Sequence, residues 1–194
     1  MNKAVIYIHG QSGNAAEAEH YKPLFPDADV IGFDYHADTP WDAKEEFGAY
    51  FDVIFQKYES VSIIANSIGA YFAMQAPTKE VVERAFFISP VVDMEKLIRN
   101  MMTRQNVTED ELREKKEIGT LSWNYLCYVR SHPIRWNVPT HILYGENDTL
   151  TSFDTMSAFA KRTGATLDVM PGGEHWFHTE QQMEFLDRWL QSYC

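Results

Sequence analysis

The chain has 194 residues, 45% of them hydrophobic and 23% charged, and these near-average values exclude a disordered or fibrous protein. The length suits one domain over residues 1–194, no apolar run is long enough to cross a bilayer, and no secretory signal pattern opens the chain, so we expect a cytoplasmic protein. The formal net charge of −11 argues against nucleic acid as a partner, because phosphate binding needs clustered Lys and Arg.

Six short apolar runs are spaced along the chain, and each predicts a β-strand. They cover residues 4–8, 29–33, 61–65, 85–89, 140–144 and 166–170. Because nearly every position in these runs is apolar, we expect strands that are covered on both faces, as in a parallel sheet.

Helical patterns occupy most of the intervals between these strands. The longest covers residues 42–58, and a shorter one covers residues 152–161. The last, at 179–191, is opened by a capping box of Thr179 and Gln182. Alternating strands and helices predict right-handed βαβ units, and hence a three-layer α/β/α fold around a mostly parallel six-stranded sheet.

Residues 91–137 break this alternation, since they contain no strand pattern. Helical patterns occur instead at residues 94–102, 109–118 and 121–130. The segment is too long for a plain connection. We therefore expect a helical cap insertion that covers the site.

Ser67 is the first candidate for chemistry, because it directly follows a buried strand pattern and precedes a helical one. Small residues stand two positions before it, at Ala65, and two positions after it, at Gly69, as a sharp strand-to-helix turn requires. In parallel sheets, ligands bind beyond the carboxyl ends of the strands, where this turn would hold the serine. Taken alone, the pattern also fits an ordinary helix N-cap.

Two later loops supply the groups that a nucleophilic serine needs, namely a base and an acid that orients the base. Asp148 lies just past the fifth strand, and His175 lies in a Gly-rich loop after the last strand. Asp154 is an alternative acid, although we expect it inside a helix and pointing away. His178 is an alternative base, or one of a metal-binding pair with His175, but no matched third ligand accompanies them.

The A-N-S-I-G segment around Ser67, the Y-G-E-N-D segment ending at Asp148 and the loop around His175 together resemble the α/β-hydrolase family. That family has a G-x-S-x-G nucleophile elbow and the chain order serine, acid, histidine. Ala65 replaces the first glycine here. The resemblance implies a catalytic triad of the three residues. It also implies a minimal α/β-hydrolase fold that starts at the oxyanion strand and has strand order 2-1-3-4-5-6.

The resemblance further implies an oxyanion hole made of two backbone N–H groups. One belongs to Ile68, which follows the serine. The other belongs to Gln11 in the H-G-Q-S-G loop, or to Ser12 if the turn is one residue longer. We place Gly10 and Ser12 among the substrate-binding residues, because glycine lets a backbone approach a ligand closely. His9 is expected to hold this loop.

The expected activity is hydrolysis of a small, apolar carboxylic ester through an acyl-enzyme. Trp123 and Tyr128 of the insertion are candidates for lining an apolar pocket, with packing onto the core as the alternative. A thioesterase, an amidase or peptidase, or an acyltransferase would use the same triad, and a non-catalytic binding module is a further alternative. The expected partner is a small ester-like molecule, and neither a metal nor an organic cofactor is expected.

Overall fold

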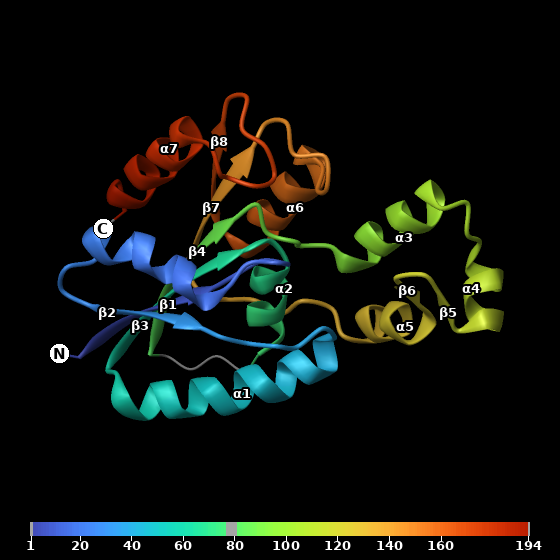
Figure 1. The fold of residues 1–194 in the computed structure, drawn as a ribbon, viewed down its shortest axis with the longest axis horizontal. Helices are drawn as coiled ribbons and strands as arrows, with labels where there is room; N and C mark the ends of the chain where they lie inside the picture. The colour runs from blue at the N-terminus through green and yellow to red at the C-terminus, as the bar shows by residue number, and fades with distance from the viewer. Residues whose placement is uncertain (1, 77–80, 194) are drawn as a thin grey trace.

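A six-stranded parallel sheet forms the centre of the computed structural model, which describes residues 2–76 and 81–193 (Figure 1). Its strands are β1 (Lys3–Ile8), β2 (Asp29–Phe33), β3 (Ser60–Asn66), β4 (Val82–Ile88), β7 (Thr140–Gly145) and β8 (Thr166–Met170). The spatial order is β2-β1-β3-β4-β7-β8, and every neighbouring pair is parallel. The predicted arrangement of the six strands, 2-1-3-4-5-6 in chain order, is confirmed.

Burial on both faces explains why the strands are apolar at nearly every position. In β1, Ile6 and Ile8 belong to the hydrophobic cluster on one face of the sheet, whereas Val5 and Tyr7 belong to the cluster on the other. Successive side chains of a strand point to opposite faces of the sheet. A sheet packed between two hydrophobic cores therefore needs apolar residues at both odd and even positions of its strands.

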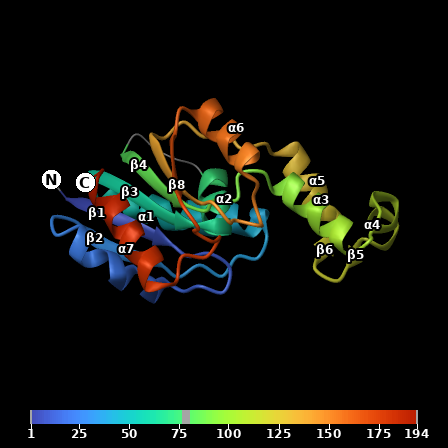
Figure 2. The same cartoon turned by 90° about the horizontal axis from the view of Figure 1, so that it is seen from above.

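Helices cover both faces of this sheet (Figures 1 and 2). The first cluster includes α1 (Pro40–Lys57), α2 (Ser67–Gln75) and α6 (Phe153–Thr163). The second includes α7 (Glu180–Gln191) and a 3₁₀ helix, η1 (Ala15–Leu24), which the sequence patterns did not predict. The three-layer α/β/α architecture is confirmed. Within the described residues, no helix has the length and hydropathy needed to cross a membrane.

The segment 91–137 extends away from the sheet, beyond the carboxyl ends of the strands (Figures 1 and 2). It contains three helices and a small antiparallel hairpin: α3 (Met94–Arg104), α4 (Glu109–Lys115), β5 (Glu117–Ile118), β6 (Leu121–Ser122) and α5 (Trp123–Ser131). The hairpin corrects the expectation of uninterrupted helices over residues 109–118 and 121–130. Lys116 and Gly119 have φ values of 67° and 58°, which end α4 and turn the chain back on itself.

Candidate active site

Ser67 occupies a sharp turn between β3 and α2. Its φ of 48° lies in the left-handed region, which non-glycine residues adopt only where the surrounding structure enforces it. Gly69 supplies part of that enforcement, because a Cβ atom there would stand 2.2 Å from the carbonyl oxygen of His9. The Ser67 carbonyl in turn accepts a hydrogen bond from the Val91 N–H at 3.0 Å. The strand end and the helix start are therefore locked together around the serine.

The structure brings Ser67, His175 and Asp148 into one hydrogen-bonded line. The Ser67 Oγ lies 2.8 Å from His175 Nε2, and His175 Nδ1 lies 2.7 Å from Asp148 Oδ2. The side chain of His175 is 22% exposed, whereas that of Asp148 is fully buried. Solvent and small molecules can therefore reach the imidazole and the serine, while the carboxylate is shielded behind them.

The Asp148 carboxylate is fixed in orientation by its own loop. Its Oδ1 accepts hydrogen bonds from the N–H groups of Leu150 at 2.7 Å and Thr151 at 3.1 Å, which leaves Oδ2 facing His175. A carboxylate that accepts several N–H bonds has little freedom to rotate. Asp154 lies outside this arrangement, exposed in the first turn of α6.

The alternative base, His178, also stays outside this line. Its ring stacks on Trp176 with centroids 4.2 Å apart, and its Nδ1 is hydrogen-bonded to the Trp176 carbonyl at 2.8 Å. Among the described residues, no group of three or more His, Cys, Asp or Glu side chains is placed to hold a metal ion.

The loop after β7 and the loop after β8 hold each other through their backbones. The Asn147 N–H donates to the Gly173 carbonyl at 2.7 Å, and the Glu146 N–H donates to the Met170 carbonyl at 3.1 Å. A Cβ atom at Gly145 would lie 2.4 Å from the carbonyl oxygen of Glu174. The loop that carries Asp148 and the loop that carries His175 thus pack as one unit, which fixes the distance between the two side chains.

The turn after β1 lies directly against the serine. A Cβ atom at Gly10 would stand 3.3 Å from Ser67 Cβ. The turn is closed by the Gly13 N–H, which donates to the Gly10 carbonyl at 3.1 Å, and Ser12 within it has a φ of 65°. That hydrogen bond does not involve the Gln11 N–H.

Ile68 lies in the first turn of α2, where backbone N–H groups have no helical carbonyl to bond. A helix N-terminus of this kind also favours negative charge. Gln11 follows Gly10, which lies against Ser67, and Ile68 follows Ser67 itself, so both are close enough in the chain to be the expected pair of oxyanion donors. That role stays a prediction.

His9 holds the end of β1, as expected. Its ring stacks on Tyr35 with centroids 4.2 Å apart, and the Tyr35 hydroxyl donates to the His9 carbonyl at 2.8 Å. The His9 Nδ1 is hydrogen-bonded to the Gly10 carbonyl at 2.8 Å. Because its ring is held between Tyr35, just after β2, and the Gly10 carbonyl, His9 supports the turn that follows it.

The two aromatic residues predicted to line a pocket lie in α5. The Trp123 side chain is partly buried against the main core, and the Trp123 backbone N–H donates to the Lys116 carbonyl at 2.8 Å, which closes the hairpin. Tyr128 stacks on His132 and lines a shallow depression of about 400 Å³ beside Trp41 and Cys127. Ser67, Asp148 and His175 do not line this depression. A substrate contact by Tyr128 therefore stays a prediction.

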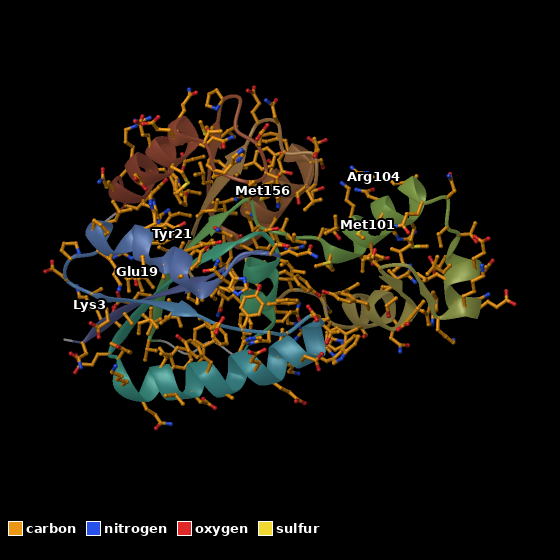
Figure 3. The ribbon with its side chains drawn as sticks, in the orientation of Figure 1. Lys3, Glu19, Tyr21, Met101, Arg104 and Met156 are labelled. Atoms are coloured by element: carbon orange, nitrogen blue, oxygen red, sulfur yellow. The ribbon has the colours of Figure 1, made fainter. Side chains whose placement is uncertain are left out.

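Two basic residues of α3 reach the region that follows β7, Arg104 the loop that carries Asp148 and Lys96 the helix α6 after it, and the sequence patterns did not predict either contact. Lys96 Nζ donates to Thr155 Oγ1 at 2.5 Å, and an Arg104 guanidinium N–H donates to the Thr149 carbonyl at 3.3 Å. Figure 3 shows Arg104 on the stretch of α3 that extends beyond the sheet. Through these two contacts, the insertion packs against the region that follows β7. Contacts between residues this far apart in sequence leave no local sequence pattern that would predict them.

The same architecture occurs in solved structures. The chain is similar to Est1E from Butyrivibrio proteoclasticus, with a TM-score of 0.71 and 15% identity over 99% of this chain and 86% of that one. It is similar to a lipase-esterase related protein from Clostridium acetobutylicum, with a TM-score of 0.68 and 11% identity over 99% and 94% of the two chains. An esterase of Pyrococcus furiosus gives a TM-score of 0.61 and 19% identity over 99% and 80%.

No family model and no curated protein sequence matches the chain. The structural likeness nevertheless covers nearly all of it. Together with the strand order and the strained serine after β3, this likeness shows that the chain has the α/β-hydrolase fold.

Proposed function

We propose that the protein is a serine hydrolase that cleaves small carboxylic esters. Ser67 is the nucleophile, His175 the general base and Asp148 the group that orients His175. The observation that carries this proposal is the line of two short hydrogen bonds, 2.8 Å from Ser67 Oγ to His175 Nε2 and 2.7 Å from His175 Nδ1 to Asp148 Oδ2. A serine hydroxyl is a weak nucleophile until a neighbouring base removes its proton.

In the first half of the reaction, Ser67 Oγ attacks the ester carbonyl carbon while His175 Nε2 takes the hydroxyl proton. Asp148 stabilises the imidazolium that forms. Negative charge develops on the former carbonyl oxygen, which the N–H groups of Gln11 and Ile68 receive. Donors that are already in place need not reorganise as this charge develops. When the tetrahedral intermediate collapses, His175 passes the proton to the departing alcohol and an acyl-enzyme remains.

In the second half of the reaction, water takes the place of Ser67 as the attacking nucleophile. His175 removes a proton from a water molecule, whose oxygen attacks the acyl carbon, and the bond to Ser67 Oγ breaks as that oxygen regains its proton. The 22% exposure of the His175 side chain supports this step, since water must reach Nε2 once the alcohol has left.

A small, apolar ester fits the surroundings of the site best. Two large apolar side chains that lie close in sequence to Asp148 and His175 are exposed. They are Phe153, the first residue of α6, at 48%, and Trp176, next to His175, at 70%. Exposed aromatic side chains beside a reactive centre offer contact area for an apolar group. One structure similar to this chain holds ferulic acid bound to Est1E, which supports testing aromatic esters beside aliphatic ones.

The test is intact-mass analysis after treatment with a fluorophosphonate, which reacts with activated serines. We expect one adduct per chain, absent in Ser67→Ala. The matched control is Ser89→Ala, since Ser89 directly follows the neighbouring strand β4 with a similar φ of 43° and the change should leave labelling intact. Folded wild-type protein without an adduct, or an adduct that persists in Ser67→Ala, would overturn the proposal.

Esters of graded acyl length, a matched thioester and a matched anilide then define the substrate class. We expect the ester to be the fastest of the three. An anilide or a thioester that is cleaved faster would replace the proposed ester specificity while leaving the triad in place.

A further inference from the structure

Asn66 occupies the N-cap position of α2 but makes no capping hydrogen bond. Asparagine is favoured there because its side-chain oxygen can accept an N–H of the first helical turn. Here the side chain is engaged elsewhere, since Asn66 Nδ2 donates to the hydroxyl oxygen of Tyr7 at 2.9 Å. The residue directly before Ser67 is thus tied to the neighbouring strand β1, not to its own helix.

The hydrogen-bond chain continues from Tyr7 to Glu17 in η1. The Tyr7 hydroxyl, accepting from Asn66, donates its own proton to the Glu17 carboxylate. Burial, together with Tyr21 and Glu17 nearby, raises the pKa of Tyr7 far above its usual range, so the hydroxyl keeps its proton and remains a donor. The three side chains form one chain of hydrogen bonds that runs from an amide to a carboxylate, and each bond polarises the next.

Glu17 also holds the end of the turn after β1. Its second carboxylate oxygen, Oε1, accepts the Asn14 N–H at 3.3 Å and completes the capping box of η1. A Cβ atom at Gly13 would lie 3.0 Å from the same oxygen, so the carboxylate packs directly against the turn. The Glu17 carboxylate therefore contacts the turn through Oε1. Through Oε2 it binds the Tyr7 hydroxyl, which in turn binds Asn66, the residue before Ser67.

We propose that Glu17 is a positioning residue that fixes the oxyanion turn relative to the nucleophile through Tyr7 and Asn66. Both ends of this link are strained, since Ser12 and Ser67 have φ values of 65° and 48°, and such conformations persist only where neighbours determine them. The link keeps the Gln11 N–H and the Ser67 Oγ directed at the same carbonyl group. This inference rests on the proposed function.

Two conservative variants break the link at different points. Tyr7→Phe keeps the ring in the core and removes both hydrogen bonds. Glu17→Gln keeps the size of the side chain but leaves one acceptor oxygen, which cannot serve both Tyr7 and Asn14. The matched control is Glu19→Gln in the same helix (Figure 3), where the carboxylate pairs with Lys22 at the surface. Glu19 has no contact with the turn or with Tyr7 among the interactions of the described residues.

The first measurement is steady-state kinetics on the best ester, at a temperature where all variants are folded. We expect Tyr7→Phe and Glu17→Gln each to lower kcat by about 10-fold with KM changed less than about twofold, because a slight misplacement of reacting groups slows chemistry more than binding. Glu19→Gln should match the wild type. The double variant should be no slower than Tyr7→Phe, because both changes break one link.

The second measurement does not depend on activity. Amide hydrogen exchange over residues 10–14 should be severalfold faster in Tyr7→Phe and Glu17→Gln than in the wild type or Glu19→Gln. Losses of kcat that add in the double variant, or exchange in the turn that is unchanged, would overturn the inference. If the wild-type protein does not react with the fluorophosphonate but exchange in the turn is still faster in the two variants, the proposed hydrolase activity is wrong and the link stands.

Discussion

His9 and Gly69 are in such close contact that a Cβ atom at position 69 would stand 2.2 Å from the His9 carbonyl oxygen and 2.9 Å from the side chain of Ile8. The end of β1 and the helix that begins with Ser67 therefore touch backbone to backbone. No side chain fits between them. This contact holds the end of β1 against the start of α2, and the sharp turn at Ser67 depends on the glycine.

Gly69→Ala should accordingly lower the free energy of unfolding by about 1–3 kcal/mol, because the added methyl group forces strand and helix apart. The matched control is Gly48→Ala in α1, where a Cβ atom would meet nothing within 4 Å. That change should raise the free energy of unfolding by about 0.5–1 kcal/mol, since alanine loses less backbone entropy in a helix. Urea denaturation measures both, and equal changes in the two variants would contradict the contact.

Asp148→Asn should lower kcat by about 10³–10⁴-fold, because an amide does not hold His175 in the protonation state that accepts the Ser67 proton. The fold should survive, since an asparagine oxygen can still accept from the Leu150 and Thr151 N–H groups. Asp154→Asn is the control, because Asp154 is exposed at the start of α6 and should leave kcat unchanged. Kinetics with circular dichroism checks both variants; activity retained in Asp148→Asn, or a matching loss in Asp154→Asn, would reassign the acid.

Most of the fold could be predicted from the sequence, because its signals are local. The bounds of β2 and β8 match the predicted runs, since polar or glycine-containing turns end each apolar stretch abruptly. The hairpin at Glu117–Ile118 and Leu121–Ser122 was missed, because strands of two residues are too short to show alternation. The positive φ of Lys116, which ends α4, has no signal in the residue type.

The hydrogen-bonded residues Ser67, Asp148 and His175 could be predicted to lie together, because each follows a strand in the chain order that the resemblance implies. The supporting contacts could not. Tyr7 reads as one more apolar position of β1, and nothing in its neighbours shows that its hydroxyl joins Asn66 to Glu17. The Lys96–Thr155 contact joins residues 59 positions apart, so it depends on the assembled fold.

The hydroxyl of Tyr71 is buried in α2, one turn after Ser67. The Tyr71 side chain is 2% exposed, and within the described part of the chain its oxygen has no hydrogen-bond partner. A buried hydroxyl without a partner costs about 1–3 kcal/mol. Tyr71→Phe should therefore raise the free energy of unfolding by about 1 kcal/mol.

Tyr35→Phe is the control for that change. Tyr35 is also buried, but its hydroxyl donates to the His9 carbonyl at 2.8 Å. The loss of this bond should lower the free energy of unfolding by about 1 kcal/mol. The two substitutions thus have opposite expected signs in the same denaturation assay. A destabilised Tyr71→Phe variant would indicate that a bound molecule satisfies the hydroxyl.

Arg130 joins the three helices of the insertion. From α5, its guanidinium donates to Glu95 of α3 at 2.9 Å and to both carboxylate oxygens of Glu109, the first residue of α4, at 2.8 Å. Hydrogen bonds from Arg130 lower the pKa of Glu95 and of Glu109 below their usual values. Both carboxylates are partly exposed, so solvent screens the interaction and the network contributes about 1 kcal/mol or less.

Arg130→Met should lower the free energy of unfolding at neutral pH by that amount, and its effect should depend on pH. A carboxylate with a lowered folded-state pKa stabilises the fold above its unfolded-state pKa of about 4.3 and loses this contribution as the pH falls through the folded-state value. The difference from the wild type should therefore shrink as the pH is lowered from 7 to about 3.5. Arg113→Met is the control, because Arg113 pairs with the highly exposed Asp110 and should have little effect at either pH. Urea unfolding at several pH values measures the difference, and a difference that stays the same in acid would show that Arg130 stabilises the insertion by packing and not by charge.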